Sequence, residues 1–192
     1  MTVLRQGVAR QTRIQETNLP KTIISDANAK DVAALAALSE YTFKDAFGPL
    51  FQPDNLTALV DQKHSVPFYE AALADPNMKP LVARSGDGAL VGYALCGPVA
   101  VPVADAPAGA LELHRIYMDP DVQSKGLGQQ LLDACFEWPP FAAAPAIYLS
   151  VFSGNVAAHR FYRRNGFEKV GEYESAVGTD RDHEFIFARL AK

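Results

Sequence analysis

A glycine-containing turn is the part of this sequence whose residue types and spacing most directly suggest chemistry. Gln123-Ser124-Lys125-Gly126-Leu127-Gly128-Gln129 lies between an apolar, strand-like stretch and the start of a helical pattern. At such a turn, successive backbone N–H groups converge and the helix dipole adds partial positive charge, so that together they bind an anion. Gly126 and Gly128 let the backbone approach a phosphate without interference from a Cβ atom. The sequence therefore predicts a phosphate-binding turn.

Three kinds of phosphate-binding loop contain glycines in this way. A Walker loop has its lysine directly after a glycine, whereas Lys125 comes before Gly126. The dinucleotide-binding fingerprint has a third glycine and an acidic residue about 20 positions later, and this turn has neither. A dinucleotide-binding oxidoreductase is therefore a weak alternative. The remaining interpretation is the loop that holds the pyrophosphate of coenzyme A in acyltransferases.

Three stretches in the second half of the chain resemble the motifs of the GNAT superfamily of N-acetyltransferases, in the same order and at the same spacing. They are Glu112-Leu113-His114-Arg115-Ile116-Tyr117-Met118, then Gln123-x-x-Gly126-x-Gly128, then Asn155-x-x-Ala158-x-x-Phe161-Tyr162-x-x-x-Gly166-Phe167. The resemblance covers roughly residues 23–190. It implies a single-domain α/β (α+β) GNAT fold, with a mixed, mostly antiparallel central sheet flanked by helices, and acetyl-CoA as the co-substrate.

The resemblance also implies a role for each motif. The backbone of a splayed strand would bind the pantetheine arm, the glycine turn would wrap the pyrophosphate, and Asn155 at a helix N-cap would contact the coenzyme near the thioester. Tyr162 would lie by the sulfur and protonate the departing thiolate. The coenzyme-binding residues implied in this way are Ile116, Tyr117, Met118, Gln123, Ser124, Lys125, Gly126, Leu127, Gly128, Gln129, Asn155 and Tyr162.

A protonated amine cannot attack a thioester, so the reaction needs a group that takes its proton, directly or through water. Glu112 lies 11 residues before Gln123, at the position that supplies the base in the histone acetyltransferases of this superfamily. Strand alternation would place Glu112, His114 and Ile116 on one face, which makes His114 a second candidate base or water-holder. No pair of histidines has metal-ligand spacing, so no metal is predicted.

The elements expected to position these residues follow the order β, helices, ββ, βαβα, ββ. Strands are predicted over residues 21–25, 81–84, 90–95, 111–118, 147–152, 167–173 and 183–190. Helices are predicted over residues 26–47, 127–138 and 156–164, with two more that begin at the caps Asp54 and Ser65. Residues 1–20 are expected to be a flexible lead-in, and residues 21–192 the catalytic domain.

Composition limits the class of protein. The chain has 192 residues and a net charge of −4, which argues against a nucleic-acid binder. No apolar run reaches the roughly 18–20 residues of a membrane span. Cys96 and Cys135 are too few for a disulfide framework, which favours a reducing, cytoplasmic location. A homodimer is a candidate assembly because dimers are common in families of this type.

The acceptor amine is expected to contact the first helices, with Tyr41, Phe43, Phe47 and Phe51, and the loop over residues 97–109. The acid-rich ending over residues 172–185 would favour a polycation, although its acids could instead be solvated hairpin residues. These features resemble the PaiA-type polyamine acetyltransferases, while RimI-type enzymes, which acetylate protein N-termini, share the same core. From another functional class, the alternative is a non-catalytic acetyl-CoA-binding regulatory module, which would lack the base or the tyrosine.

Overall fold

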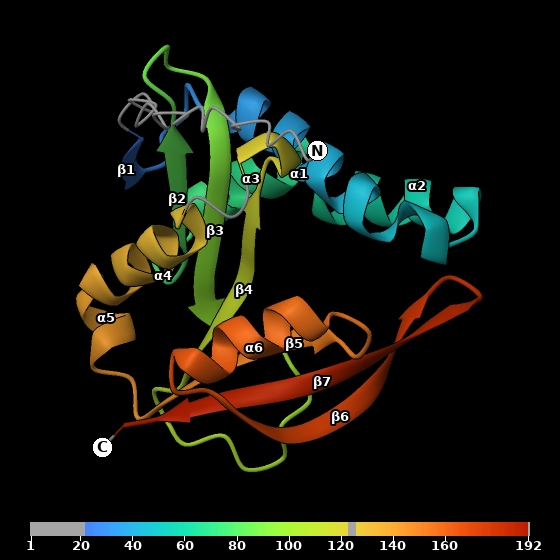
Figure 1. Cartoon of the computed structure of the whole chain (residues 1–192), viewed down its shortest axis with the longest axis vertical. Coiled ribbons are helices and arrows are strands. Elements are labelled where there is room, and N and C mark those ends of the chain that lie inside the picture. The colour runs from blue at the N-terminus through green and yellow to red at the C-terminus, as the bar shows by residue number, and fades with distance from the viewer. Residues whose placement is uncertain (1–21, 123–125, 192) are drawn as a thin grey trace, which may run out of the picture.

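The computed structural model describes residues 22–122 and 126–191 and places a seven-stranded sheet at the centre of the chain (Figure 1). The strands are β1 (Ile23–Asp26), β2 (Lys79–Arg84), β3 (Leu90–Pro98), β4 (Leu111–Met118), β5 (Ala146–Phe152), β6 (Glu168–Val177) and β7 (Asp180–Leu190). Their order across the sheet is β1-β2-β3-β4-β5-β7-β6, and neighbours are antiparallel except β4 and β5, which are parallel. The prediction of a mixed, mostly antiparallel sheet is confirmed.

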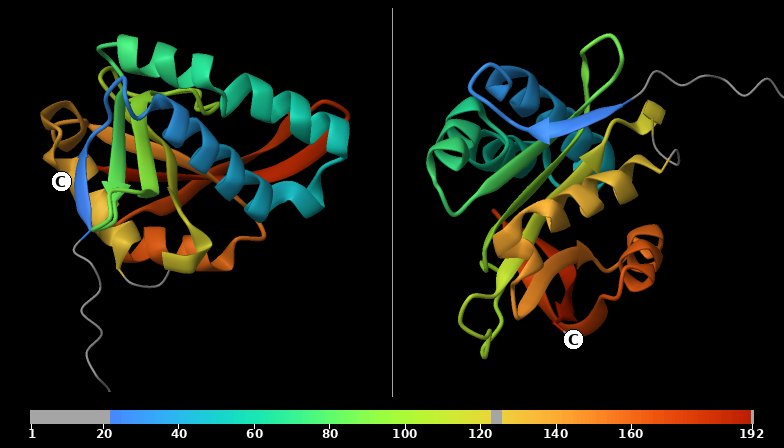
Figure 2. Two further views of the ribbon diagram at one scale, coloured as in Figure 1. Left: turned by 90° about the horizontal axis from the view of Figure 1, so that it is seen from above. Right: turned by 90° about the vertical axis from the view of Figure 1, so that its left-hand side faces the viewer.

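Helices cover both faces of the sheet. On one face lie α1 (Val32–Phe47), α2 (Pro53–Lys63) and α3 (Val66–Ala74), and on the other α4 (Leu127–Glu137), α5 (Pro139–Ala142) and α6 (Val156–Arg164), as the two views of Figure 2 show. Leu35 of α1 and Tyr69 of α3 share a buried cluster with Tyr93 of β3. Leu131 of α4 and Tyr162 of α6 belong to the larger core on the opposite face. These apolar side chains fix the two helical layers against the strands.

The two halves of the sheet are joined where β4 meets β5. These strands pair only through Leu111 with Ile147 and Glu112 with Tyr148, and they diverge beyond that point. In Figure 1, β2, β3 and β4 run nearly vertically, whereas β6 and β7 cross below them. The divergence leaves one side of β4 without a neighbouring strand over residues 113–118 within the described parts of the chain.

A β-bulge interrupts β4 at His114. Leu95 pairs with Arg115 and Cys96 pairs with Leu113, so His114 is the extra residue. Beyond the bulge, Ile116 packs against the core beneath α4, whereas Tyr117 packs against the cluster beneath α1 and α3. The prediction that simple alternation places Glu112, His114 and Ile116 on one face is therefore wrong, because the bulge shifts the alternation by one residue.

The other predicted elements are present with altered ends. The first helix begins at Val32 rather than at Asp26, which belongs to β1. Asp54 is not the cap of α2: Gln52 precedes this helix and Pro53 begins it, since proline suits a first turn. Two short 3-10 helices (Gly48–Leu50 and Pro120–Val122) and α5 were not predicted. The expected lead-in over residues 1–20 lies outside the described residues. Within those residues, every helix is too short or too polar to cross a membrane.

Candidate active site

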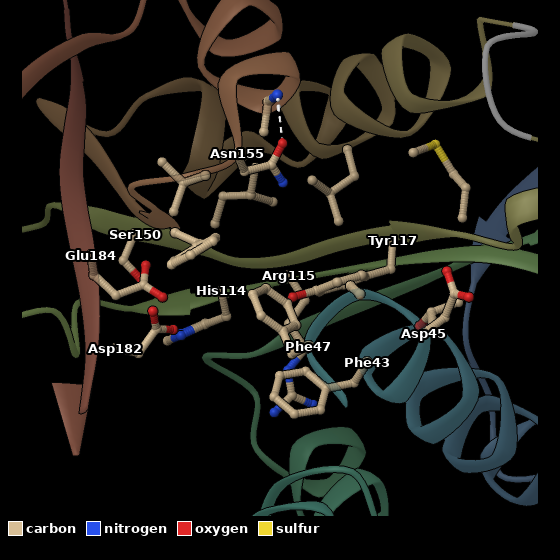
Figure 3. A pocket seen from close by; sticks show the side chains of 18 of the residues that line it. Phe43, Asp45, Phe47, His114, Arg115, Tyr117, Ser150, Asn155, Asp182 and Glu184 are labelled. Atoms are coloured by element: carbon tan, nitrogen blue, oxygen red, sulfur yellow. Dashed lines mark hydrogen bonds between the residues drawn. The ribbon is translucent and has the colours of Figure 1, made fainter. Parts of the chain in front are cut away.

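A pocket of about 810 Å³ opens where β4 and β5 diverge. Residues of α1, α2, β4, β5, α6 and the β6–β7 hairpin line it, together with the first residues of α4. Figure 3 shows side chains from both halves of the sheet converging on this space, with Asn155 on one side and Phe43 and Phe47 on another. The pocket therefore brings together the second half of the chain, which carries the predicted motifs, and the first helices.

The N-terminus of α4 contributes Gly126, Gly128 and Gln129 to the pocket. Gly126 precedes the helix with a φ of 81°, a conformation that glycine adopts at little cost. A Cβ atom on Gly128 would lie 3.0 Å from the sulfur of Met118, so α4 approaches the Met118 side chain closely at this glycine. The side chain of Leu127 is buried in the core instead. The predicted residues Gln123, Ser124 and Lys125 lie outside the described residues.

The strand β4 supplies Ile116, Tyr117 and Met118, all of which line the pocket. The Tyr117 ring stacks on Tyr93, with centroids 5.7 Å apart and planes 16° apart. Burial raises the pKa of the Tyr117 hydroxyl, which therefore stays protonated at ordinary pH. Because β5 has diverged here, this part of β4 faces the pocket rather than another strand.

The helix α6 places Asn155 and Tyr162 in the pocket wall. The Asn155 side chain caps the helix by accepting a hydrogen bond from the backbone N–H of Ala158 at 3.0 Å, drawn in Figure 3. Tyr162 is 8% exposed, and its ring lies between Phe161 and Phe167, with centroids 5.3 and 5.9 Å away. Burial raises the pKa of the Tyr162 hydroxyl, so this group carries its proton at working pH.

Glu112 is 5% exposed and is not among the residues that line the pocket. Its Oε2 accepts hydrogen bonds from the backbone N–H groups of Ala100 at 2.6 Å and Val101 at 2.9 Å, and its Oε1 lies 3.1 Å from His114 Nδ1. Burial alone would raise the pKa of Glu112, but His114 and the two amides together lower it. The carboxylate thus ties the loop after β3 to β4.

His114 lines the pocket beside this carboxylate. Its Nε2 is the buried side-chain nitrogen that has no hydrogen-bond partner among the described residues. A Cβ atom at Gly97 would collide with the Met78 sulfur and would lie 3.1 Å from this nitrogen, so the glycine opposite Glu112 makes room for both side chains. The predicted pair of Glu112 and His114 is therefore brought together, with only His114 reaching the pocket.

The acidic ending of the chain divides into two groups. Asp182 and Glu184 line the pocket, and Asp182 is only 7% exposed, so the interpretation of these two as solvated hairpin residues is wrong. Figure 3 shows their carboxyl groups side by side, with Ser150 next to Glu184. Burial, and then the charge of Asp182, raises the pKa of Glu184 to about 8. Glu172 and Glu174, in contrast, are exposed to solvent.

Aromatic rings of the first helices form an apolar wall of the pocket, as the sequence predicted for three of four residues. Phe43, Phe47 and Phe51 line it, with Phe43 and Phe47 4.9 Å apart and Phe43 and Phe51 6.4 Å apart. Tyr41 is 51% exposed and lies outside the pocket lining. The loop over residues 97–109, also expected to meet the acceptor, contributes no residue to this lining.

A buried polar network behind β4 was not foreseen from the sequence. Arg115, which lines the pocket, donates a hydrogen bond to the Tyr69 hydroxyl at 2.8 Å, and Tyr69 donates to Ser39 Oγ at 2.7 Å. Ser39 Oγ also contacts His64 Nδ1 at 2.6 Å and the Tyr93 hydroxyl at 2.9 Å. Burial and the charge of Arg115 lower the pKa of His64 to about 3, so its ring is neutral. Only the contacts of the folded chain reveal this network, because its members are far apart in sequence.

Comparison with known proteins agrees with this geometry. The model of the acetyltransferase (GNAT) family matches residues 41–167. The chain is 37% identical over 115 residues to the N-alpha-acetyltransferase RimI of Mycobacterium tuberculosis. This alignment covers 58% of this chain and 68% of RimI. It is 36% identical over 89 residues to the spermine/spermidine N(1)-acetyltransferase of Bacillus subtilis, covering 46% of this chain and 59% of that one.

A solved structure has the same fold. The PaiA N-acetyltransferase of Thermoplasma acidophilum, determined in complex with coenzyme A, aligns with a TM-score of 0.70 at 19% identity over 89% of this chain and 99% of that one. The family match covers the β4 strand, the α4 turn and α6, which together line the pocket. The chain therefore belongs to the GNAT family and is an N-acetyltransferase that uses acetyl-CoA as its co-substrate.

Proposed function

We propose that the chain transfers the acetyl group of acetyl-CoA to a primary amine of a polyamine, by direct attack of the amine on the thioester. The observation that carries this proposal is the lining of the pocket: Asp182 and Glu184 line it together with a group of phenylalanine rings. Carboxylates attract ammonium groups, and aromatic faces attract cations and pack against methylenes. A flexible chain of methylenes and ammonium groups matches both surfaces.

The binding of acetyl-CoA is assigned to three elements. The N-terminus of α4, with Gly126, Gly128 and Gln129, offers backbone N–H groups and the positive end of a helix dipole to the pyrophosphate. Ile116, Tyr117 and Met118 of β4 offer backbone groups to the pantetheine arm, and Asn155 lies next to them at the start of α6. This arrangement would place the thioester carbonyl between the β4 and β5 sides of the pocket.

Tyr162 is assigned the role of acid. When the C–S bond breaks, the sulfur leaves as a thiolate, and a nearby phenol that still carries its proton can donate it. Burial keeps the Tyr162 hydroxyl protonated, and it lines the pocket on α6. No covalent enzyme intermediate is proposed, because Cys96 and Cys135 are both buried in the core.

The names of the two relatives above indicate different acceptors, a protein N-terminus and a polyamine. The test therefore compares both kinds of acceptor. We expect thiol release from acetyl-CoA to depend on added amine, and kcat/KM to be higher for spermidine than for butylamine or for a peptide with a free N-terminal alanine. The preference should weaken as salt is added, because charge attraction between mobile groups is screened.

Two outcomes would contradict the proposal. Faster turnover of the peptide than of spermidine would assign the chain to the acetylation of protein N-termini. Binding of acetyl-CoA without amine-dependent thiol release would favour the non-catalytic regulatory module.

A further inference from the structure

Asp182 and Glu184 form a carboxyl pair in the wall of the pocket. They are two residues apart on β7, so their side chains leave the same face of the strand, and both line the pocket. Figure 3 shows the two carboxyl groups side by side, and burial raises the pKa of both, so the pair disfavours two negative charges at once. The pair is therefore a place inside the pocket where one proton can be kept and exchanged.

We propose that Glu184 takes the proton from the attacking amine, with Asp182 and Ser150 as its positioning residues. This inference rests on the proposed function, since it assumes an amine acceptor. Glu184 lies opposite Phe152, the last residue of β5, and the chain continues from there through Asn155 into α6. Figure 3 shows Glu184, Asp182 and Ser150 at one end of the pocket, with His114 beside them.

The contrast with Glu112 supports this assignment. Both oxygens of Glu112 are already engaged, by two backbone amides and by His114, and the side chain does not line the pocket. Its lowered pKa also makes it a weak acceptor for a proton from an ammonium group. Glu184 lines the pocket, and its raised pKa, about 8, is close to the working pH at which general bases are most effective.

The protons of the reaction can be followed through these groups. The ammonium form of the acceptor gives its first proton to the Glu184 carboxylate, and the neutral nitrogen then forms a bond with the thioester carbon. As the C–S bond breaks, Tyr162 gives its proton to the thiolate. The attacking nitrogen loses its second proton to solvent, and the Tyr162 phenolate takes one back from solvent, which restores the hydroxyl. Glu184 then releases its proton to solvent, so the net products are the amide, the free thiol and one proton.

The pH dependence follows from the groups around Glu184. Below its pKa the carboxyl is protonated and cannot act, so kcat/KM should rise with pH through a value near 8, while the amine itself titrates near ~10. The titratable and charged groups that line the pocket or face Glu184 are Asp182 on β7, His114, Arg115 and Tyr117 on β4, Tyr162 and Arg164 on α6, Tyr173 on β6, Lys63 on α2 and Asp45 on α1.

The first test compares three variants. Glu184→Gln should lower kcat by about 100-fold or more, the usual contribution of a general base, and should remove the pH limb near 8. Its loss should be much smaller with an acceptor amine whose pKa lies well below the assay pH, because that nitrogen is already neutral. Asp182→Asn should move the limb to lower pH, because the charge of Asp182 raises the pKa of Glu184. Glu174→Gln, on the exposed side of the same hairpin, should leave the profile unchanged.

The outcomes separate this inference from the proposed function. Wild-type protein that acetylates no amine would overturn both. Wild-type protein that acetylates spermidine, while Glu184→Gln keeps its kcat and its pH limb, would overturn the assignment of Glu184 alone. A limb that does not move in Asp182→Asn would also overturn it, and this measurement decides the matter even if Glu184→Gln fails to fold.

Discussion

Glu112 and Glu184 have the same side chain, but their surroundings shift the pKa of the two carboxyl groups in opposite directions. Glu112 faces two backbone N–H groups and His114, which hold its negative charge in place. Glu184 is shielded from solvent and faces the carboxyl group of Asp182, so its charged form is disfavoured. The sequence places both residues in acid-containing strands, but the partners that decide their pKa come from distant segments.

The hydroxyl of Tyr162 can be tested without disturbing the packing of its ring. Tyr162→Phe should lower kcat by about 100-fold, because the thiolate then leaves without a proton donor, while KM for acetyl-CoA changes little. The measurement is thiol release at saturating acceptor. Tyr148→Phe is the matched control, since Tyr148 is equally buried but does not line the pocket. Normal turnover by Tyr162→Phe would refute the assignment of the acid.

Substitution of Glu112 should strongly lower the stability of the fold. Glu112→Ala removes the acceptor for the N–H groups of Ala100 and Val101 and should destabilise the fold by about 2 kcal/mol. Glu112→Gln keeps a side-chain oxygen and should lose less. Urea unfolding midpoints of the two variants measure this difference, and equal stability of Glu112→Ala and wild type would contradict the structural role.

At the scale of single elements, the sequence motifs identify β4, α4 and α6 well because their spacing is local. Asn155 is the N-cap of α6, as predicted, and Gly166 follows this helix with a φ of 82°. The bulge at His114 could not be predicted, because a bulge exists only relative to the partner strand β3. Its effect is to shift the alternation by one residue, so that Ile116 packs in the same core as Leu113 and Tyr117 packs in the opposite cluster.

The turn before α4 gives a prediction for coenzyme binding. Gly126→Ala forces a residue with a Cβ atom into a left-handed conformation, at a cost of roughly 1–2 kcal/mol, although nothing described lies within 4 Å of the added atom. If the strain is relieved by a change in the turn, the Kd for coenzyme A should rise by about tenfold in calorimetry. Gly88→Ala imposes the same strain in the β2–β3 turn, away from the pocket, and should leave this Kd unchanged.

At the scale of the whole molecule, the order of strands and helices and the family were predictable, whereas the composition of the acceptor end was not. Asp182 and Glu184 reach the pocket because β7 inserts between β5 and β6, a pairing between distant segments. The network of Arg115, Tyr69 and Ser39 likewise joins three elements that are separated along the chain. Local patterns carry no information on such contacts.

The free energy of unfolding of the whole protein should depend on pH through the titration of Glu184. Its pKa is raised in the folded state from about 4.5 to about 8, so between these values the folded chain holds a proton that the unfolded chain has lost. The free energy of unfolding should therefore fall as pH rises through this window. Urea midpoints measured from pH 5 to pH 9 should decline less steeply for Glu184→Gln. A wild-type profile that rises throughout this range would contradict the raised pKa.

The divergence of β4 from β5 has a further consequence. From Leu113 to Met118, β4 has β3 on one side only within the described chain, so it is an edge strand enclosed by the protein itself. Exposed edges invite pairing with other chains and lead to aggregation. Here the unpaired side of β4 opens on the pocket, which all six of these residues line. An extended ligand with amide groups along its arm could complete the sheet there without a second protein chain.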